Sequence, residues 1–116
     1  MVYIGFNPRE ITSFAGIQNL EDSPFVSIPS DRVGRFLRGE FHSCCGMEHR
    51  SMLAVIKHRF GLHIPVPLTS MLYRLKSDDK VIIIVVENIR RIAPEESYTH
   101  EELRKARIFF HLHTIP

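Results

Sequence analysis

The feature that most constrains the fold is one uninterrupted apolar run. Residues 81–86 read Val-Ile-Ile-Ile-Val-Val, with Lys80 before them and Glu87 after them. Six residues are far too few to cross a membrane, which takes about 18 apolar residues in a row. A run that is apolar on both of its alternating sides is typical of a strand buried on both faces of a sheet. The sequence therefore predicts a central strand over residues 80–86 and no membrane partner.

Shorter apolar or alternating segments predict the strands that complete this sheet. They lie at residues 2–6, 25–28, 68–75 and 107–115. In the last of them, apolar residues alternate with histidines. His111 and His113 would then form a solvent-facing pair on an edge strand.

Helices are predicted between these strands. The first would follow Ser30, which can cap a helix, and would stop at Gly39. The second has apolar residues at helical spacing over 52–60 and ends at Gly61, a residue suited to a left-handed cap. Its length places its beginning near residues 46–49.

A third, short helix completes the prediction. Thr99 and Glu102 match a capping box for a helix that runs through Ala106. The whole pattern predicts an α+β fold in one domain over residues 1–116, with a single mixed sheet of about five strands covered on one side by two or three helices. An uncovered face or edge of such a sheet would favour a homodimer.

The charge is nearly balanced overall but unevenly placed. The 116 residues include 15 Lys+Arg and 13 Asp+Glu, a net charge of +2. This balance excludes a histone-like protein that coats nucleic acid. Residues 31–59 hold six basic residues against three acidic ones, whereas residues 87–102 hold two arginines against five glutamates. A local basic surface suits a small anionic ligand better than a long polyanion.

The two cysteines do not imply an oxidising compartment, and they leave two chemical alternatives open. Cys44 and Cys45 are adjacent and cannot easily bridge each other. No basic, apolar leader opens the chain, so we expect a cytoplasmic protein. His42 and His49 flank the cysteines, but the spacing fits no standard zinc pattern, and no metal or other cofactor is expected. Cys45 and His49 could also form a nucleophile–base pair at a helix start, or the cysteines could simply pack.

Residues 41–51 form the first candidate site. The segment leads into the second predicted helix, where free N–H groups and the helix dipole favour an anion. Gly46 would let the backbone approach a ligand closely, and the small Ser43 would leave room for it. His49 would lie in the first turn and could donate or accept a proton near neutral pH. The alternative is a half-exposed histidine without a role.

Residues 87–95 form the second candidate site, directly after the buried strand. Loops at strand ends can aim polar groups from a rigid scaffold. Arg90 and Arg91 could hold phosphate oxygens by forked hydrogen bonds. If the strand continued, the two arginines would point to opposite sides and one of them would face the site. The alternative is a solvated strand exit with surface Arg–Glu pairs.

These patterns, in this order, resemble one known family over about two-thirds of the chain. The resemblance rests on the following segments: 2–4, Glu48-His49-Arg50-Ser51, Phe60-Gly61-Leu62, Ile64-Pro65-Val66-Pro67, 76–80, 82–86, Arg91-Ile92-Ala93-Pro94-Glu95 and 99–103. The chain resembles the viral ring nucleases, small proteins of archaeal viruses and mobile elements that act as type III anti-CRISPR proteins. The match that keeps the helix length puts His49 on the family's histidine and Glu48 where the family has glycine.

The resemblance implies an enzyme. A homodimer would bind a cyclic oligoadenylate, cyclic tetra-adenylate by expectation, across its two-fold axis and cleave it without metal. The ribose 2′-OH would attack the adjacent phosphate in line and leave a 2′,3′-cyclic phosphate. His49 would be the general acid, Arg91 would stabilise the phosphorane charge, and Glu95 would orient the arginine or the ligand. The implied ligand-binding residues are Asn7, Ser43, Gly46, Arg50, Ser51 and Arg90.

Two other readings compete with this one. A non-catalytic dimer could lay arginines along duplex DNA, for which the candidates are Arg32, Arg35, Arg38 and Arg50. The chain could also be an interaction protein that blocks a host factor and carries no chemistry.

Overall fold

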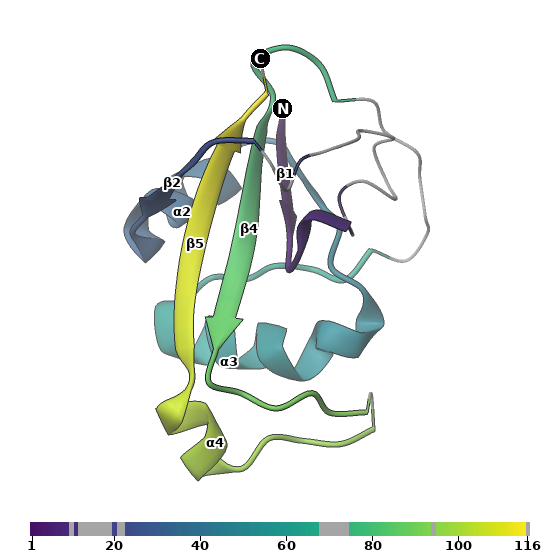
Figure 1. Cartoon of the computed structure of the whole chain (residues 1–116), viewed down its shortest axis with the longest axis vertical. Helices are drawn as coiled ribbons and strands as arrows, with labels where there is room; N and C mark the ends of the chain where they lie inside the picture. The colour runs from purple at the N-terminus through teal and green to yellow at the C-terminus, as the bar shows by residue number, and fades with distance from the viewer. Residues whose placement is uncertain (10, 12–19, 21–22, 68–74, 94, 116) are drawn as a thin grey trace.

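The computed structural model describes residues 1–9, 11, 20, 23–67, 75–93 and 95–115, and it confirms an α+β fold (Figure 1). The strands are β1 (Val2–Gly5), β2 (Phe25–Ile28), β3 (Phe41–Ser43), β4 (Lys80–Glu87) and β5 (Arg107–Thr114). The helical elements include α2 (Ser30–Leu37), the 3-10 turn η2 (Met47–His49), α3 (Arg50–Phe60) and α4 (His100–Lys105). Among the described residues, no helix is long and apolar enough to span a membrane.

The five strands form one mixed sheet in the order β2-β5-β4-β1-β3. β1 runs parallel to both β3 and β4, while β5 runs antiparallel to β4 and β2. The central position of β4 confirms the prediction from its apolar run: Val81 to Ile84 are at most 3% exposed. β5 is also internal, so the prediction for its histidines is wrong. His113 is only 4% exposed, because β2 and β4 flank it on both sides.

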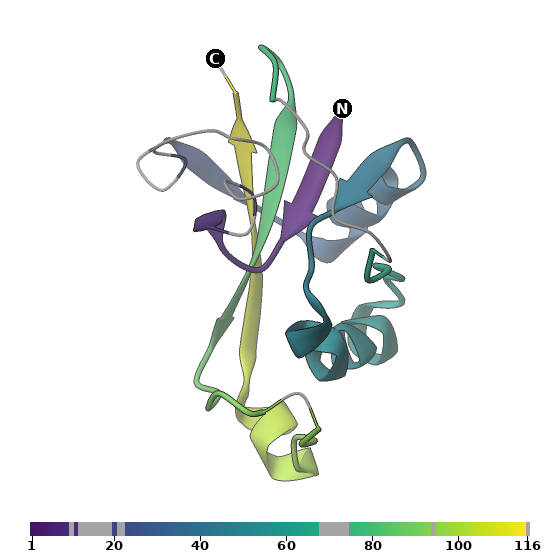
Figure 2. The same cartoon turned by 90° about the vertical axis from the view of Figure 1, so that its right-hand side faces the viewer.

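The helices α2 and α3 cover one face of the sheet (Figure 2). Val33 of α2 and Ile56 of α3 pack against Ile4, Ile82 and Ile84 in the larger buried cluster. A smaller cluster lies on the opposite face. There the sheet residues Tyr3, Val81 and Ile83 pack with other buried residues, namely Ile11, Leu20, Cys44 and Ile115.

The helix boundaries follow local signals, with one exception. Gly61 ends α3 in the left-handed conformation, at φ 70°, as its position predicts. Thr99 and Glu102 make both hydrogen bonds of the capping box that opens α4. Ser30 is not a cap: it is the first residue of α2, and Pro29 precedes it without a side-chain hydrogen bond. A proline can stand there because the first helical N–H groups need no partner within the helix.

Residues 41–43 form β3, although the sequence predicts no strand there. β3 is only three half-buried residues long, and so short a segment has no recognisable alternating pattern. Its strand conformation comes from pairing with β1. The strand predicted at 68–75 falls almost entirely on residues outside the described part of the chain.

The start of β4 closes one end of the sheet. The Asp79 carboxylate accepts hydrogen bonds from the N-terminal ammonium at 3.0 Å and from the Lys76 amide at 2.7 Å. The backbone of Asp79 also pairs with Ile115, and Lys80 donates to the Met1 carbonyl. This end therefore ties β1, β4 and β5 together. The opposite end carries α4 and the loop that follows β4 (Figure 1).

Candidate functional site

A cavity of about 530 Å³, here called the β4-end cavity, lies where β4 ends beside the start of α3. Its wall combines apolar residues of β4 and α3 with a set of polar or aromatic groups. These groups are Phe6, Asn7, Glu48, His49, Arg90, Arg91 and Tyr98. Four residues predicted from the sequence therefore meet in one place: Asn7, His49, Arg90 and Arg91.

His49 is held at the junction of η2 and α3. Its ring stacks on Phe6, with centroids 4.3 Å apart and planes at 26°. Its Nε2 lies 3.8 Å from the Glu48 carboxylate, and 26% of its side chain is exposed. The stacking fixes the ring plane and leaves the imidazole reachable from the cavity. An imidazole in this setting can transfer a proton to or from a bound ligand.

Glu48 and Gly46 form a local unit at the start of the helical segment. Gly46 has an ordinary φ of −71°, and its carbonyl accepts the His49 amide at 3.1 Å. A Cβ on Gly46 would collide with the Glu48 carboxylate. Glu48 folds back over Gly46, so a larger residue here would displace the carboxylate, which is the mobile end of an exposed side chain. A carboxylate in this position interacts favourably with the positive end of the helix dipole.

The helical segment begins with η2 at Met47, within the predicted range of 46–49, so its free amides come before Arg50 and Ser51. The Arg50 amide donates to the Met47 carbonyl, so it is already used within η2. The N-terminal amides of the combined helical segment thus belong to residues 47 and 48. The expected cradle at Arg50 and Ser51 is not the start of this segment.

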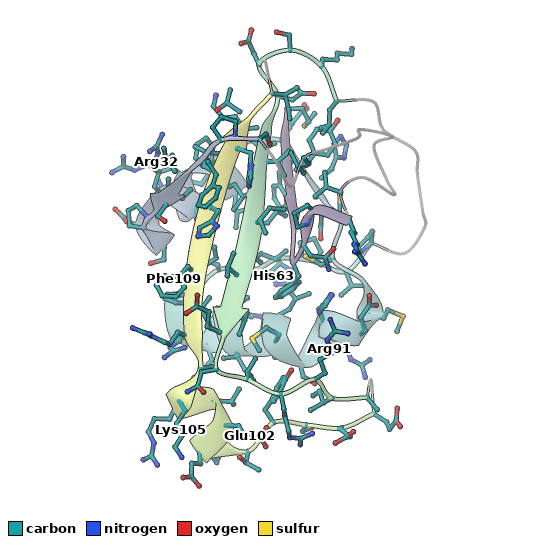
Figure 3. The ribbon with its side chains drawn as sticks, viewed as in Figure 1. Arg32, His63, Arg91, Glu102, Lys105 and Phe109 are labelled. Atoms are coloured by element: carbon teal, nitrogen blue, oxygen red, sulfur yellow. The ribbon has the colours of Figure 1, made fainter. Side chains whose placement is uncertain are left out.

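Arg90 and Arg91 both line the cavity, but they differ in their partners. Arg90 forms ion pairs with Glu102, at 2.8 Å, and with Glu96, at 3.2 Å. Hydrogen bonds to these two carboxylates raise the pKa of Arg90 above its ordinary value. Among the described residues, no carboxylate lies within ion-pair distance of Arg91. Arg91 lies beside α3 and above α4 (Figure 3), and its guanidinium is available to an anion.

The chain turns sharply between β4 and these arginines. Asn88 has φ 59°, and its side-chain amide donates to the Lys105 carbonyl at 3.0 Å. Asparagine tolerates this left-handed conformation better than most residues. The turn ends β4 at Glu87, so strand alternation does not continue through Arg90 and Arg91.

The carboxylate that organises this loop is Glu96, which the sequence analysis missed in favour of Glu95. Glu96 accepts the Ala93 amide at 3.0 Å and pairs with Arg90. The bond from the Ala93 amide, with help from Arg90, lowers the pKa of Glu96. Glu95 is exposed and does not line the cavity. The two glutamates are adjacent, and no sequence signal separates them.

Tyr98 is a second residue that the sequence did not reveal. Its half-buried ring lines the β4-end cavity, and burial raises the pKa of its hydroxyl. The phenol thus stays protonated at neutral pH and can donate a hydrogen bond. An isolated tyrosine in a polar segment gives no periodic signal by which it could be found.

The other predicted ligand-binding residues do not line the cavity. The Ser43 hydroxyl accepts the Cys45 amide at 3.3 Å, and the Ser51 hydroxyl donates to the Glu96 carbonyl at 3.3 Å. Arg50 is exposed at the first position of α3. Gly46 lies against the Glu48 carboxylate, and it is Glu48 that lines the cavity.

The thiols of Cys44 and Cys45 do not converge on a common point. Both are fully buried, Cys44 in the smaller cluster and Cys45 in the larger one on the other face. The Cys45 thiol faces the Ile4 carbonyl, 3.8 Å away. Within the described part of the chain, no three His, Cys, Asp or Glu side chains are grouped as metal ligands would be.

Comparison with known proteins gives a likeness to a solved structure. No protein-family model matches the chain, and no curated protein does. Among solved structures, the chain is similar to B116 of Sulfolobus turreted icosahedral virus, with a TM-score of 0.58 and 12% sequence identity. The match covers 96% of this chain and 97% of that one. At this identity the likeness shows a shared fold, and the chain thus has the fold of a small Sulfolobus virus protein.

Proposed function

We propose that this protein is a metal-independent ring nuclease that cleaves cyclic oligoadenylate and thereby counters or damps type III CRISPR signalling. The observation that carries the proposal is the meeting of His49 and Arg91 in one cavity. The site offers an imidazole whose ring is held by stacking and a guanidinium that has no carboxylate partner among the described residues, and this cleavage needs these two groups. The family resemblance of the sequence and the fold shared with a virus protein support the same reading.

The chemistry asks for three things: an aligned nucleophile, charge stabilisation and a protonated leaving group. The ribose 2′-oxygen forms a bond to the adjacent phosphorus as its proton passes to solvent water, and the P–O5′ bond breaks. His49 gives a proton to the departing 5′-oxygen. Arg91 stabilises the charge that builds up on the equatorial phosphate oxygens. The products are a 2′,3′-cyclic phosphate and a 5′-hydroxyl.

Arg90 then has a positioning role. Its ion pairs with Glu96 and Glu102 join the loop after β4 to α4. Arg90 thus holds in place the loop that carries Arg91, the next residue along the chain. Glu95 keeps its proposed role toward the ligand only if it moves, because it lies outside the cavity wall.

A homodimer would supply two such cavities to one ring. A cyclic tetra-adenylate has four phosphates around a two-fold axis, and one cavity of about 530 Å³ takes part of it. The net charge of +2 is doubled in a dimer, which suits a compact anion.

The decisive experiment incubates the protein with cyclic tri-, tetra- and hexa-adenylate, with and without EDTA, and resolves the products by mass spectrometry. We expect linear products with 2′,3′-cyclic phosphate ends in both conditions, and a dimeric mass by light scattering. Three intact rings after prolonged incubation would refute the proposal. Activity that disappears with EDTA would refute its metal-independent form.

One observation favours the duplex-DNA alternative. Arg32 and Arg35 are exposed on α2, and Arg38 follows its end. Anisotropy titrations of labelled duplex DNA at several salt concentrations test this reading. A DNA-binding protein would lose affinity steeply with salt and would bind worse when Arg32 and Arg35 are replaced by alanine.

A further inference from the structure

A second cavity, here called the α3–α4 groove, lies between the outer side of α3 and α4. Its volume is about 590 Å³, similar to that of the β4-end cavity. Tyr98 lines both cavities and stands between them. Neither His49 nor Arg91 lines the groove. An inference about its ligand therefore goes beyond the proposed reaction.

Hydrogen bonds connect the groove walls at both ends. At one end the Ser51 hydroxyl donates to the Glu96 carbonyl at 3.3 Å. At the other end Arg59 donates to the Ala106 carbonyl, also at 3.3 Å. These contacts bound the groove lengthwise, so it suits a short, compact molecule rather than a peptide or nucleic acid strand that runs through it.

The lining of the groove has an apolar floor and a basic rim. The floor consists of Ala54, Val55, Tyr98 and Leu103. The rim consists of His58, Arg59, His100 and Arg104. Within the described part of the chain, no carboxylate side chain lines the groove and none pairs with Arg59 or Arg104. The two arginines thus present uncompensated charge beside an apolar surface.

We propose that the α3–α4 groove binds a mononucleotide-sized anion with a flat, apolar body. Inorganic phosphate alone would leave the apolar floor uncovered, and an uncharged apolar molecule would leave the charges of both arginines without an anion. A nucleoside monophosphate uses both: its base lies on Tyr98, Val55 and Leu103, and its phosphate meets the arginines. The groove volume lies within the usual range for small-molecule sites, roughly 300–1,000 Å³.

The test measures AMP binding by calorimetry, with adenosine and inorganic phosphate as the two half-ligands. It uses a protein in which His49→Ala and Arg91→Ala suppress binding in the β4-end cavity. We expect AMP to bind at least about tenfold more tightly than either half-ligand. Arg104→Glu should weaken AMP binding about tenfold or more, and Ala54→Trp, which fills the groove, should abolish it. Arg35→Glu, an equal charge change on α2, is the matched control and should leave binding unchanged.

Three outcomes would overturn the proposal. The first is AMP binding no tighter than that of adenosine or phosphate. The second is equal AMP affinity in the Arg104→Glu, Ala54→Trp and Arg35→Glu proteins, each shown to be folded by circular dichroism. The third is an Ala54→Trp protein whose oligomeric state changes while its AMP affinity does not, since the groove would then pack against another copy of the chain. Failure of ring cleavage would not affect any of these results.

Discussion

The two ends of the sheet use charged residues in opposite ways. At the end where β4 begins, the Asp79 carboxylate is 7% exposed and is fully engaged by the N-terminal ammonium and the Lys76 amide. At the end where β4 finishes, Arg90 is likewise engaged by two carboxylates, but Arg91 beside it has no such partner among the described residues. Both ends thus contain a structural ion pair. Only the second keeps a cation facing a cavity.

This difference separates residues that hold the fold from residues that could act on a ligand. A charge whose partners lie within the chain stabilises the geometry but gains little from a ligand. A charge without an internal partner adds little to stability and can form its strongest contact with a bound anion. Substitutions at the two ends of the sheet test that separation.

Replacing His49 by alanine tests whether the end of the sheet where β4 finishes carries the chemistry. Loss of a general acid should reduce turnover of cyclic oligoadenylate by about 10² to 10⁴-fold, while ligand binding and unfolding midpoint change little. Single-turnover kinetics and thermal unfolding measure the two effects. His58→Ala is the matched control, since His58 lies on the same helix but lines the α3–α4 groove. Unchanged turnover in His49→Ala would remove this residue from the mechanism.

The paired variants Arg91→Ala and Arg90→Ala test whether adjacent arginines have different roles. Arg91→Ala should reduce turnover by about 10² to 10³-fold because the developing phosphate charge loses its partner, without changing stability. Arg90→Ala should instead accelerate hydrogen exchange of the 88–99 amides, because Glu96 and Glu102 lose their common cation. Faster exchange in Arg91→Ala and normal exchange in Arg90→Ala would reverse the assignment.

Asp79→Asn tests whether the ion pair at the end where β4 begins stabilises the fold. Loss of two charge-assisted hydrogen bonds should lower the free energy of unfolding by about 2 kcal/mol at pH 7, measured by urea denaturation of a chain with its own N-terminus. The neighbouring Asp78→Asn, which preserves a residue tolerant of its φ of 72°, is the control.

The pH dependence of this effect has a definite sign. Burial opposes the charge of Asp79, but the Lys76 amide and the terminal ammonium outweigh it and hold its pKa below the ordinary 3.8. The stabilisation is therefore complete above about pH 3.8 and is lost as the pH falls through the lower, folded-state pKa. The gap between wild type and Asp79→Asn should close over that range. A gap that widens on acidification would contradict the ion pair.

Thr99→Ala tests how far the capping box of α4 stabilises this helix, which carries Glu102, a partner of Arg90. The Thr99 hydroxyl accepts the Glu102 amide at 3.1 Å, so its loss should cost about 1 kcal/mol of helix stability. Hydrogen exchange of the amides at 99–106 reports the change locally. Thr99→Ser keeps the hydroxyl and should behave like wild type. If serine were as damaging as alanine, the effect would come from packing of the methyl group and not from the cap.

Glu48→Gln should give the smallest effect and act in the favourable direction. The Glu48 carboxylate lines the β4-end cavity, where it would repel a phosphate. Removing an exposed charge of this kind should tighten binding of cyclic oligoadenylate by about two- to fivefold at low salt, and less at high salt. Weaker binding in Glu48→Gln would mean that the carboxylate helps the ligand, for example by keeping His49 in place.

The predictability of the fold followed the strength of each local signal. The apolar run of β4, the capping box of α4 and Gly61 each concern a few adjacent residues, and the structure agrees with all three. β3 was missed because its strand character comes from pairing with β1. The exposure of His113 was misjudged because an alternating pattern does not tell an edge strand from an internal one.

The candidate site was predictable in its parts but not in its connections. His49, Arg90, Arg91 and Asn7 could be named as candidates, since helix starts and strand exits are where polar groups are aimed. The pairing of Arg90 with Glu96 and Glu102 could not be predicted, because it depends on how the loop after Asn88 folds back toward α4. The position of Tyr98 in the cavity wall depends on the same folding back of the loop.

The central strand, most helix boundaries and the charge of the flanking segments could be read from the amino-acid order, because they depend on neighbours along the chain. The pairing of Arg90, the role of Glu96 in the loop and the position of Tyr98 between two cavities emerged from the folded chain. The physical reason is that an ion pair or a cavity wall depends on distances between residues far apart in the sequence. For charges in particular, a difference of a few ångströms decides whether a cation is neutralised within the chain or left to meet a ligand.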